Sequence, residues 1–322
     1  MADTILEIQD LVVQYRTDEA IIYAVNGINL TVSQGETIGL VGETGAGKTT
    51  IARSILRILQ TPPAKFCGGK ILFQGRDLME ISEHQMRKIR GDKIAMIFQD
   101  PMTALNPIER VGYQIAEAVK LHNKVSRAQA EIKACEMLEM VGIPAERYKE
   151  FPHQFSGGMK QRVIIAMALA CNPLLLLADE PTTALDVTIQ AQVLQMMQTL
   201  KEQLGTSVIM ITHDLGVVAD ICQSVAVVYA GEIVEYGTVE HIFDYPAHPY
   251  TVGLFNSLPR LDSTEHRLKP IKGLMPDPTN LPKGCKFCER CPEATEECSE
   301  KHPETVEISP GHQVKCLLRG CR

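Results

Sequence analysis

Three clusters of residues in this sequence have the types and spacing that chemistry requires: a glycine-rich loop, a pair of adjacent acids and a late cysteine-rich segment. The loop is GETGAGKT, residues 42–49, which fits G-x-x-x-x-G-K-[ST] between an expected strand and an expected helix. Its glycines permit a tight turn whose N–H groups face phosphates, and the helix adds its positive end. We therefore expect Lys48 to bind β and γ phosphates and the Thr49 hydroxyl to bind Mg²⁺.

The acid pair follows an apolar run in LLLLADEP, residues 174–181. Acids at the carboxyl end of a buried strand lie where open α/β sheets bind ligands, and burying carboxylates without partners is costly. A strand-end salt bridge is the plain alternative. In the same chain as a phosphate loop, we expect Asp179 to act on Mg²⁺ through water and Glu180 to be the general base that deprotonates the attacking water.

An α/β scaffold is predicted to position these residues. Apolar, β-branched runs have the length of buried parallel strands, and they occur in ETIGLVG, KIAMIFQ, LLLLADE, SVIMITH and SVAVVYAG. Helical patterns lie between some of them, as in KTTIARSILRIL and AQVLQMMQTLKEQLG. Near the amino end, apolar and polar residues partly alternate in LEIQDLVVQY and AVNGINLTVSQGE. This pattern favours an antiparallel sheet. No internal repeat is visible.

Composition limits the class of protein. The 322 residues are 45% hydrophobic and 22% charged, which suits one large globular domain with a small appendage. The net charge of -7 argues against nucleic acid as a partner. We expect a chain that is neither secreted nor membrane-spanning, because no signal pattern opens it and its longest apolar run falls short of the ~20 residues that a span needs. Ten cysteines in a reducing compartment then indicate core residues, metal ligands or redox centres.

The segment FSGGMKQR, residues 155–162, makes the prediction specific, because its Ser-Gly-Gly resembles the signature motif of ABC-type ATPases. The other family motifs occur in the order that the family requires. Gln99 matches the Q-loop, Asp186 the D-loop and His213 the switch histidine. The resemblance covers roughly residues 5–240. Met159 stands where many members have Gln, which is similar to the peptide-importer branch.

This resemblance implies a shared site, in which each ATP lies between one chain's phosphate loop and the signature of a facing chain. Gln99 would contact metal or water and His213 the γ-phosphate, so that Glu180, His213 and Gln99 form the catalytic set. Tyr15 would stack on adenine, with Tyr23 as the competing aromatic residue. Mg²⁺ would be held by Thr49, Gln99 and Asp179. The implied ATP contacts are Tyr15, Gly42, Glu43, Thr44, Gly45, Ala46, Gly47, Lys48, Thr49, Thr50, Gln99, Ser156, Gly157, Gly158, Asp179 and Asp186.

The tail, with HPYTVGLFNSLPRL and then GCKFCERCPEATEEC, resembles the carboxyl extension of oligopeptide and dipeptide importer ATPases, a branch that also handles nickel. The family pattern selects four ligands, Cys285, Cys291, Cys298 and Cys316, and leaves Cys288 out. Thiolates select iron–sulfur clusters or zinc, and we prefer a [4Fe–4S] cluster, with Zn²⁺ as the alternative. Because the segment is short of apolar residues, we expect this centre to fold the tail and to lie away from the ATP. Four other cysteines are interpreted as packed small residues: Cys67, Cys135, Cys171 and Cys222.

The sequence therefore predicts an α/β P-loop ABC ATPase domain at residues 1–245, with a RecA-like parallel core, an antiparallel β subdomain and a helical subdomain at about 100–170. Residues 246–322 form the cysteine-rich extension. The implied function is ATP hydrolysis that energises di- or oligopeptide import, at the cytoplasmic face of the membrane. Implied partners are two permease subunits, a second ATPase subunit of the same or a sister kind, and an extracytoplasmic solute-binding protein. Alternatives are a nickel importer ATPase and a soluble ABC ATPase that does not transport.

Overall fold

The computed structural model describes residues 3–183, 185–257 and 270–319. These residues divide into two compact units, each assembled from separated parts of the chain. The first unit comprises Met1–Leu6, Thr31–Thr37 and Leu72–Thr212. The second comprises Glu7–Leu30, Ile38–Ile71 and His213–Arg322.

The first unit is built on three parallel strands in the order β8-β7-β6. Their bounds are Ile94–Ile97 for β6, Leu175–Asp179 for β7 and Ser207–Ile211 for β8. Every residue of β7 and β8 is buried, which explains their mostly apolar sequences and confirms the predicted strands. A short strand β5, Arg76–Asp77, pairs antiparallel with the end of β4, Ala64–Phe73.

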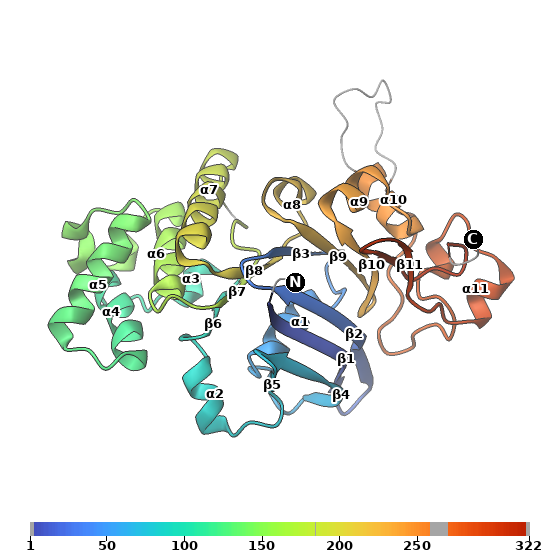
Figure 1. Ribbon diagram of the computed structural model, residues 1–322, viewed down its shortest axis with the longest axis horizontal. Helices are drawn as coiled ribbons and strands as arrows, with labels where there is room; N and C mark the ends of the chain where they lie inside the picture. Colours follow the sequence, from blue (N-terminus) through green and yellow to red (C-terminus); the bar gives the residue numbers. More distant parts are fainter. Residues whose placement is uncertain (1–2, 184, 258–269, 320–322) are drawn as a thin grey trace. The chain divides into compact units, whose positions relative to one another are not determined.

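Most of the helices belong to this first unit, and α4, α5 and α6 pack side by side (Figure 1). Their bounds are α2 Glu83–Ile89, α3 Pro101–Ala104, α4 Val111–His122, α5 Arg127–Met140, α6 Gly157–Leu169 and α7 Val187–Leu204, with short 3-10 turns at Ala145–Lys149 and Pro152–Gln154. Polar caps fix where they begin: Ser126 and Gln129 form a capping box on α5. Gly205, at φ 65°, ends α7 in the left-handed conformation that glycine adopts without strain.

The second unit holds two groups of strands. One has the order β11-β12-β10-β9-β3, in which β3 and β9 are parallel and the other pairs are antiparallel. The other has the order β2-β1-β4. Strand bounds are β1 Thr4–Arg16, β2 Ile21–Ser33, β3 Thr37–Val41, β4 Ala64–Phe73, β9 Ser224–Tyr229, β10 Glu232–Thr238, β11 Val306–Ser309 and β12 His312–Val314. Helix bounds are α1 Lys48–Ile55, α8 Leu215–Ile221, α9 Val239–Asp244, α10 Pro249–Asn256 and α11 Glu296–Glu300, with a 3-10 turn at Cys288–Arg290.

The carboxyl extension shares the core of this second unit. Strand β12 continues the sheet by pairing with β10, and Glu235 lies opposite Val314. The Phe287 ring, 2% exposed, packs against Tyr229 and Tyr250 at centroid distances of 5.2 and 5.4 Å. Burying an aromatic ring of this size stabilises the contact by about 2 kcal/mol or more. The extension is therefore attached to β9 by an apolar contact that its own composition did not predict.

Over the described residues, none of the helices combines the length and the apolar composition that crossing a membrane requires.

Candidate nucleotide and cysteine sites

The phosphate-loop pattern lies between β3 and α1, which confirms the strand and the helix predicted around it. Two of its glycines are required by geometry. Gly42 has φ 149°, and a Cβ there would lie 2.1 Å from the Val228 carbonyl oxygen. Gly47 has φ 105°, and its Cβ would lie 2.5 Å from the Ala24 carbonyl oxygen. Any larger residue would push the backbone out of this turn.

The lysine of the loop folds back over it. Lys48 is buried, and its Nζ donates to the carbonyl oxygens of Gly42 at 2.7 Å and Glu43 at 3.0 Å. These bonds hold the ammonium group inside the curve of the loop. A cation held there by neutral carbonyls is suited to bind an anion that enters the loop.

The two candidate adenine-stacking residues have different surroundings. The Tyr15 hydroxyl lies 3.1 Å from the Thr50 hydroxyl, at the start of α1. Tyr23 is 36% exposed, and its backbone N–H donates to the Pro278 carbonyl oxygen at 2.9 Å. Of the two, Tyr15 is therefore the one with a side-chain contact to the phosphate-loop helix.

The acid pair of the first unit lies where β7 ends. Asp179 is 1% exposed, whereas the next residue turns out of the strand: Glu180 has φ 48°, a conformation that non-glycine residues rarely adopt. Its carboxylate accepts from Gln99 Nε2 at 3.0 Å and from the Thr183 hydroxyl at 2.9 Å. The structure thus brings Glu180 and Gln99 together, 81 residues apart in sequence. Thr183 was not predicted, and only its nearness to Glu180 in sequence pointed to it.

The signature and D-loop residues are exposed at helix starts in the same unit. Ser156 caps α6, where its hydroxyl accepts from the Met159 N–H at 3.4 Å, and Gly157 begins the helix. Asp186 is the N-cap residue of α7, and its neighbour Val187 is 84% exposed. Exposed polar and apolar groups at two helix starts are suited to contact another molecule.

His213 belongs to the second unit, in the turn between β8 and α8, and it is exposed. The following Asp214 caps α8 by accepting from the N–H groups of Gly216 and Val217 at 2.9 and 3.3 Å. The cap fixes the start of α8 at Leu215, two residues after His213.

The cysteine segment gathers its thiols in the second unit. The Cys285 N–H donates to the Cys298 carbonyl oxygen at 2.8 Å. Burial, and the nearby thiols of Cys288, Cys316 and Cys298, raise the pKa of Cys285 to about 11. Burial likewise raises the pKa of Cys291, and its thiol is close enough to Cys316 and Cys298 for their charges to contribute. All four predicted ligands therefore lie in one neighbourhood, and Cys288 lies there too.

This gathering does not yet form a metal site. Within the residues that the structure describes, no three His, Cys, Asp or Glu side chains are arranged to hold a metal ion. The donor types suit a thiophilic metal. The arrangement of these donors in the described part of the chain does not suit one.

The cysteine segment contacts the phosphate loop through one residue, whereas the metal centre is expected to lie away from the ATP. Arg290, between Cys288 and Cys291, donates to both carboxylate oxygens of Glu43 at 2.8 and 3.0 Å. The paired residues are 247 positions apart, so no local pattern could have indicated this contact. The charge on Arg290 was the only signal available from the sequence.

A second unpredicted cluster attaches the extension to β10. Glu232 is 5% exposed, and its carboxylate accepts from Lys286, His302 and Lys315 at 2.8, 2.9 and 3.2 Å. Burial alone would raise the pKa of Glu232, but the hydrogen bond from His302 and the charges of both lysines outweigh it and lower the pKa to about 2. A buried carboxylate surrounded by three donors is a stable anchor only while it is ionised.

Replacing this carboxylate is predicted to destabilise the chain in a pH-dependent way. Because the pKa of Glu232 is lower in the folded chain, its contribution is present above pH ~4.5 and is lost as the pH falls toward 2. Glu232→Gln should lower the free energy of unfolding at pH 7 by roughly 3 kcal/mol. Urea unfolding followed by circular dichroism should show this difference more than halved at pH 3.

Glu297→Gln is the matched control, because Glu297 pairs with Lys301 on an exposed helix turn. Its effect should stay below ~1 kcal/mol. An equal loss for Glu232→Gln at both pH values would contradict the role of the ionised carboxylate.

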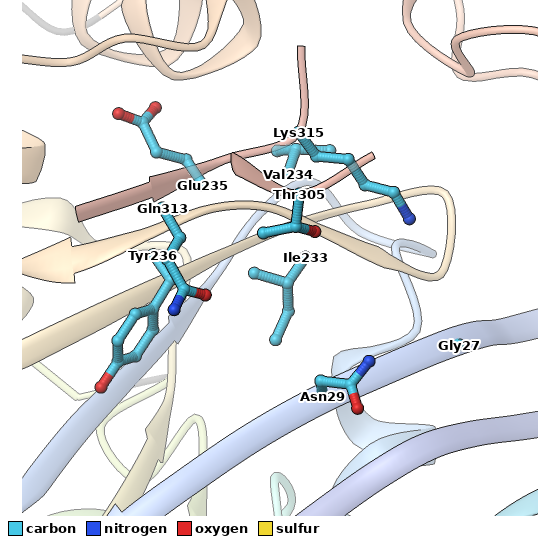
Figure 2. Close-up of a pocket in the computed structure, with 9 residues that line it drawn as sticks. All are labelled: Gly27, Asn29, Ile233, Val234, Glu235, Tyr236, Thr305, Gln313 and Lys315. Atoms are coloured by element: carbon cyan, nitrogen blue, oxygen red, sulfur yellow. The ribbon is translucent and has the colours of Figure 1, made fainter. Parts of the chain in front are cut away.

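A cavity of about 210 Å³ lies beside β10 in the second unit. Its lining includes Asn29, Tyr236, Gln313 and Lys315, as Figure 2 shows. Glu235 points away from Ile233 and Asn29 in this view, and its carboxylate accepts from His312 Nε2 at 2.8 Å. None of the sequence-predicted site residues lines this cavity.

The comparisons with known families match two parts of the chain. The family described as ABC transporter matches residues 25–183. The family described as oligopeptide/dipeptide transporter, C-terminal region, matches residues 234–298.

Curated relatives extend the match over nearly the whole chain. The sequence is 53% identical to a probable peptide ABC transporter ATP-binding protein, y4tR, of Sinorhizobium fredii, over 98% of this chain and 95% of the relative. It is 50% identical to the oligopeptide transport ATP-binding protein OppD of Bacillus subtilis, over 98% of this chain and 88% of that relative. It is 48% identical to the dipeptide transport ATP-binding protein DppD of the same organism, over 99% of this chain and 96% of that relative.

Solved structures share the fold over a shorter stretch. The dimeric ATP-binding cassette MJ0796 bound to ADP and Pi gives a TM-score of 0.66 at 28% identity, over 73% of this chain and 98% of that chain. The protein cbiO1 of Clostridium perfringens, part of the ABC transporter complex cbiONQ, gives 0.66 at 27% identity, over 78% and 95%.

Proposed function

The chain belongs to the ABC transporter ATP-binding proteins of the oligopeptide and dipeptide branch, and from this premise we propose that it hydrolyses ATP to energise peptide import. The observation that carries this proposal is the similarity of 48–53% over at least 98% of the chain, which includes the cysteine-rich tail. Relatives named for oligopeptide and for dipeptide transport are nearly equally similar. We therefore propose peptides as the solute class and name no peptide length, with nickel as the alternative.

We propose that the phosphate loop binds the ATP triphosphate in the second unit. The N–H groups of residues 42–50 face the phosphates, and Lys48 exchanges its carbonyl partners for the β and γ phosphates. The Thr49 hydroxyl would hold Mg²⁺ together with Asp179 and Gln99, and the ion would neutralise developing phosphate charge. The contact between the hydroxyls of Tyr15 and Thr50 supports Tyr15 as the adenine-stacking residue.

Glu180 is proposed as the general base. Gln99 and Thr183 both donate to Glu180 Oε2, which fixes the carboxylate that would accept a proton from water. Gln99 would also contact the metal or the attacking water. His213 is proposed to contact the γ-phosphate and to position that water.

A second ATPase chain, identical or a sister, is proposed to complete each site. Ser156, Gly157 and Gly158 are at the start of α6, where the hydroxyl and free N–H groups can bind the γ-phosphate held by a facing chain. Asp186 and the exposed Val187 would lie at the same junction. The dimeric form of the similar cassette MJ0796 supports this arrangement.

The cysteine neighbourhood supports a proposed metal centre. Cys285, Cys291, Cys298 and Cys316 would hold a [4Fe–4S] cluster, or Zn²⁺ as the alternative, and its role would be structural. Thiols must lose their protons to bind a metal. Because the pKa of Cys285 is raised, metal binding would compete with protonation of this thiol. No step of ATP hydrolysis depends on this centre.

The domain division stays a prediction: an ATPase domain at residues 1–245 and an extension at 246–322. The proposed partners are two permease subunits, a sister or identical ATPase subunit and an extracytoplasmic solute-binding protein, with the chain at the cytoplasmic face of the membrane. Purification in mild detergent from its own cells tests this. The expected result is recovery of membrane permeases with the chain, and recovery with ribosomes or DNA instead would contradict it.

A further inference from the structure

The second residue of the phosphate loop, Glu43, is held at three points by the rest of the second unit. Its N–H donates to the Tyr250 hydroxyl at 2.9 Å, and its carbonyl oxygen accepts from Lys48 at 3.0 Å. Its carboxylate receives the two bonds from Arg290. Tyr250 and Arg290 both come from the carboxyl-terminal part of the chain, so that part determines the position of Glu43.

Arg290 is itself rigidly placed. Its side chain is 6% exposed, and its Nε donates to the Lys272 carbonyl oxygen at 3.1 Å. The same guanidinium lies 5.7 Å from the centroid of the Tyr229 ring and donates to the Tyr229 hydroxyl at 3.3 Å. Two parallel N–H···O bonds between a fixed guanidinium and a carboxylate are strong and geometrically specific.

The charges of Glu43 and Arg290 affect how the phosphate loop can bind an anion. Glu43 places a negative charge within the loop that is proposed to receive a triphosphate, and like charges disfavour each other at short range. Arg290 offsets that charge and orients the carboxylate toward itself. The Met275 methyl group, which would lie 3.2 Å from a Cβ at Gly45, packs the same extension against the loop.

We propose that Arg290 is a positioning residue for ATP binding: it neutralises and immobilises Glu43, so the extension sets the nucleotide affinity of the phosphate loop. This inference rests on the proposed function, because it takes ATP as the ligand of the loop. It assigns to the extension a role that is separate from metal binding.

The test is the Kd for ATP of the full chain, measured by equilibrium binding in the absence of turnover. Arg290→Met should raise Kd about tenfold, the factor that ~1.4 kcal/mol of lost interaction produces. The double variant Arg290→Met with Glu43→Gln should return to within about threefold of wild type, because the uncovered charge is also removed. A purely structural role for Arg290 predicts no such rescue.

Arg319→Met is the matched control, since Arg319 is an arginine of the same extension that pairs with Glu293. It should leave Kd within about twofold of wild type. If Arg290→Met does not fold, Arg290→Gln with and without Glu43→Gln gives the same comparison, because glutamine also removes the charge and the guanidinium fork.

An unchanged Kd in Arg290→Met, or a loss that Glu43→Gln does not relieve, would overturn the inference. Lys48→Ala separates this failure from failure of the proposed function. Normal ATP binding in Lys48→Ala would show that the loop is not the ATP site, whereas lost binding there with normal binding in Arg290→Met would reject the role of Arg290 alone.

Discussion

Glu180→Gln is expected to slow ATP hydrolysis by ~10² or more, the usual scale for losing a general base, while ATP binding is retained. The amide keeps an oxygen that can accept from Gln99 and Thr183, so the side chain should stay in place. It cannot take a proton from water. ATP would then remain uncleaved, and the variant should accumulate as an ATP-bound dimer.

Single-turnover hydrolysis and size-exclusion chromatography with ATP measure these two effects. Lys48→Ala is the contrasting variant, because it should weaken ATP binding itself and form no ATP-bound dimer. Near-normal turnover in Glu180→Gln would assign the base to another residue. Identical behaviour of the two variants would contradict the separate roles of loop and acid.

Loss of the metal in Cys298→Ser is the second large effect that we expect. Wild-type protein purified without oxygen should be brown, with about four iron and four sulfide ions per chain, or colourless with one zinc ion on the alternative. Cys298 is 6% exposed and its carbonyl oxygen accepts from the Cys285 N–H, so it is at the centre of the thiol neighbourhood. Removing one of four thiolates should abolish the metal and expose the tail to protease.

Cys288→Ser is the matched control within the same segment, and it should keep its metal. Metal analysis by mass spectrometry and limited proteolysis give the two readouts. Wild-type protein that contains no metal and still resists protease would reject the centre. Loss of metal in Cys288→Ser would show that Cys288 is a ligand and that the chosen four are wrong.

The strands and the phosphate loop could be predicted because their causes are local. Buried parallel strands need a mostly apolar sequence, as in β7 and β8, and the loop needs glycine where a Cβ would meet backbone, as at Gly42. The acid pair was found for the same reason, since its position at the end of β7 is set by its own strand. The ABC transporter family followed from the order of such local motifs.

The contacts of the carboxyl extension could not be predicted, because each joins residues far apart in the chain. Glu232 and its three donors, the Glu43–Arg290 pair and the packing of Phe287 on Tyr229 all join the extension to residues much earlier in the chain. The left-handed backbone of Glu180 is also set by packing. The low apolar content of the tail predicts that it needs a metal to fold, whereas Phe287 shows that the tail also packs into the core of the second unit.

The dependence of turnover on protein concentration tests most directly whether ATP is hydrolysed at sites shared between two chains. In dilute purified protein, turnover per chain should rise with concentration and reach a plateau when the dimer is saturated. If the chain hydrolyses ATP only after a sister ATPase subunit is added, the shared site would be supported and the working pair would be a heterodimer. A constant turnover per chain, from protein shown to be monomeric throughout, would contradict the shared site.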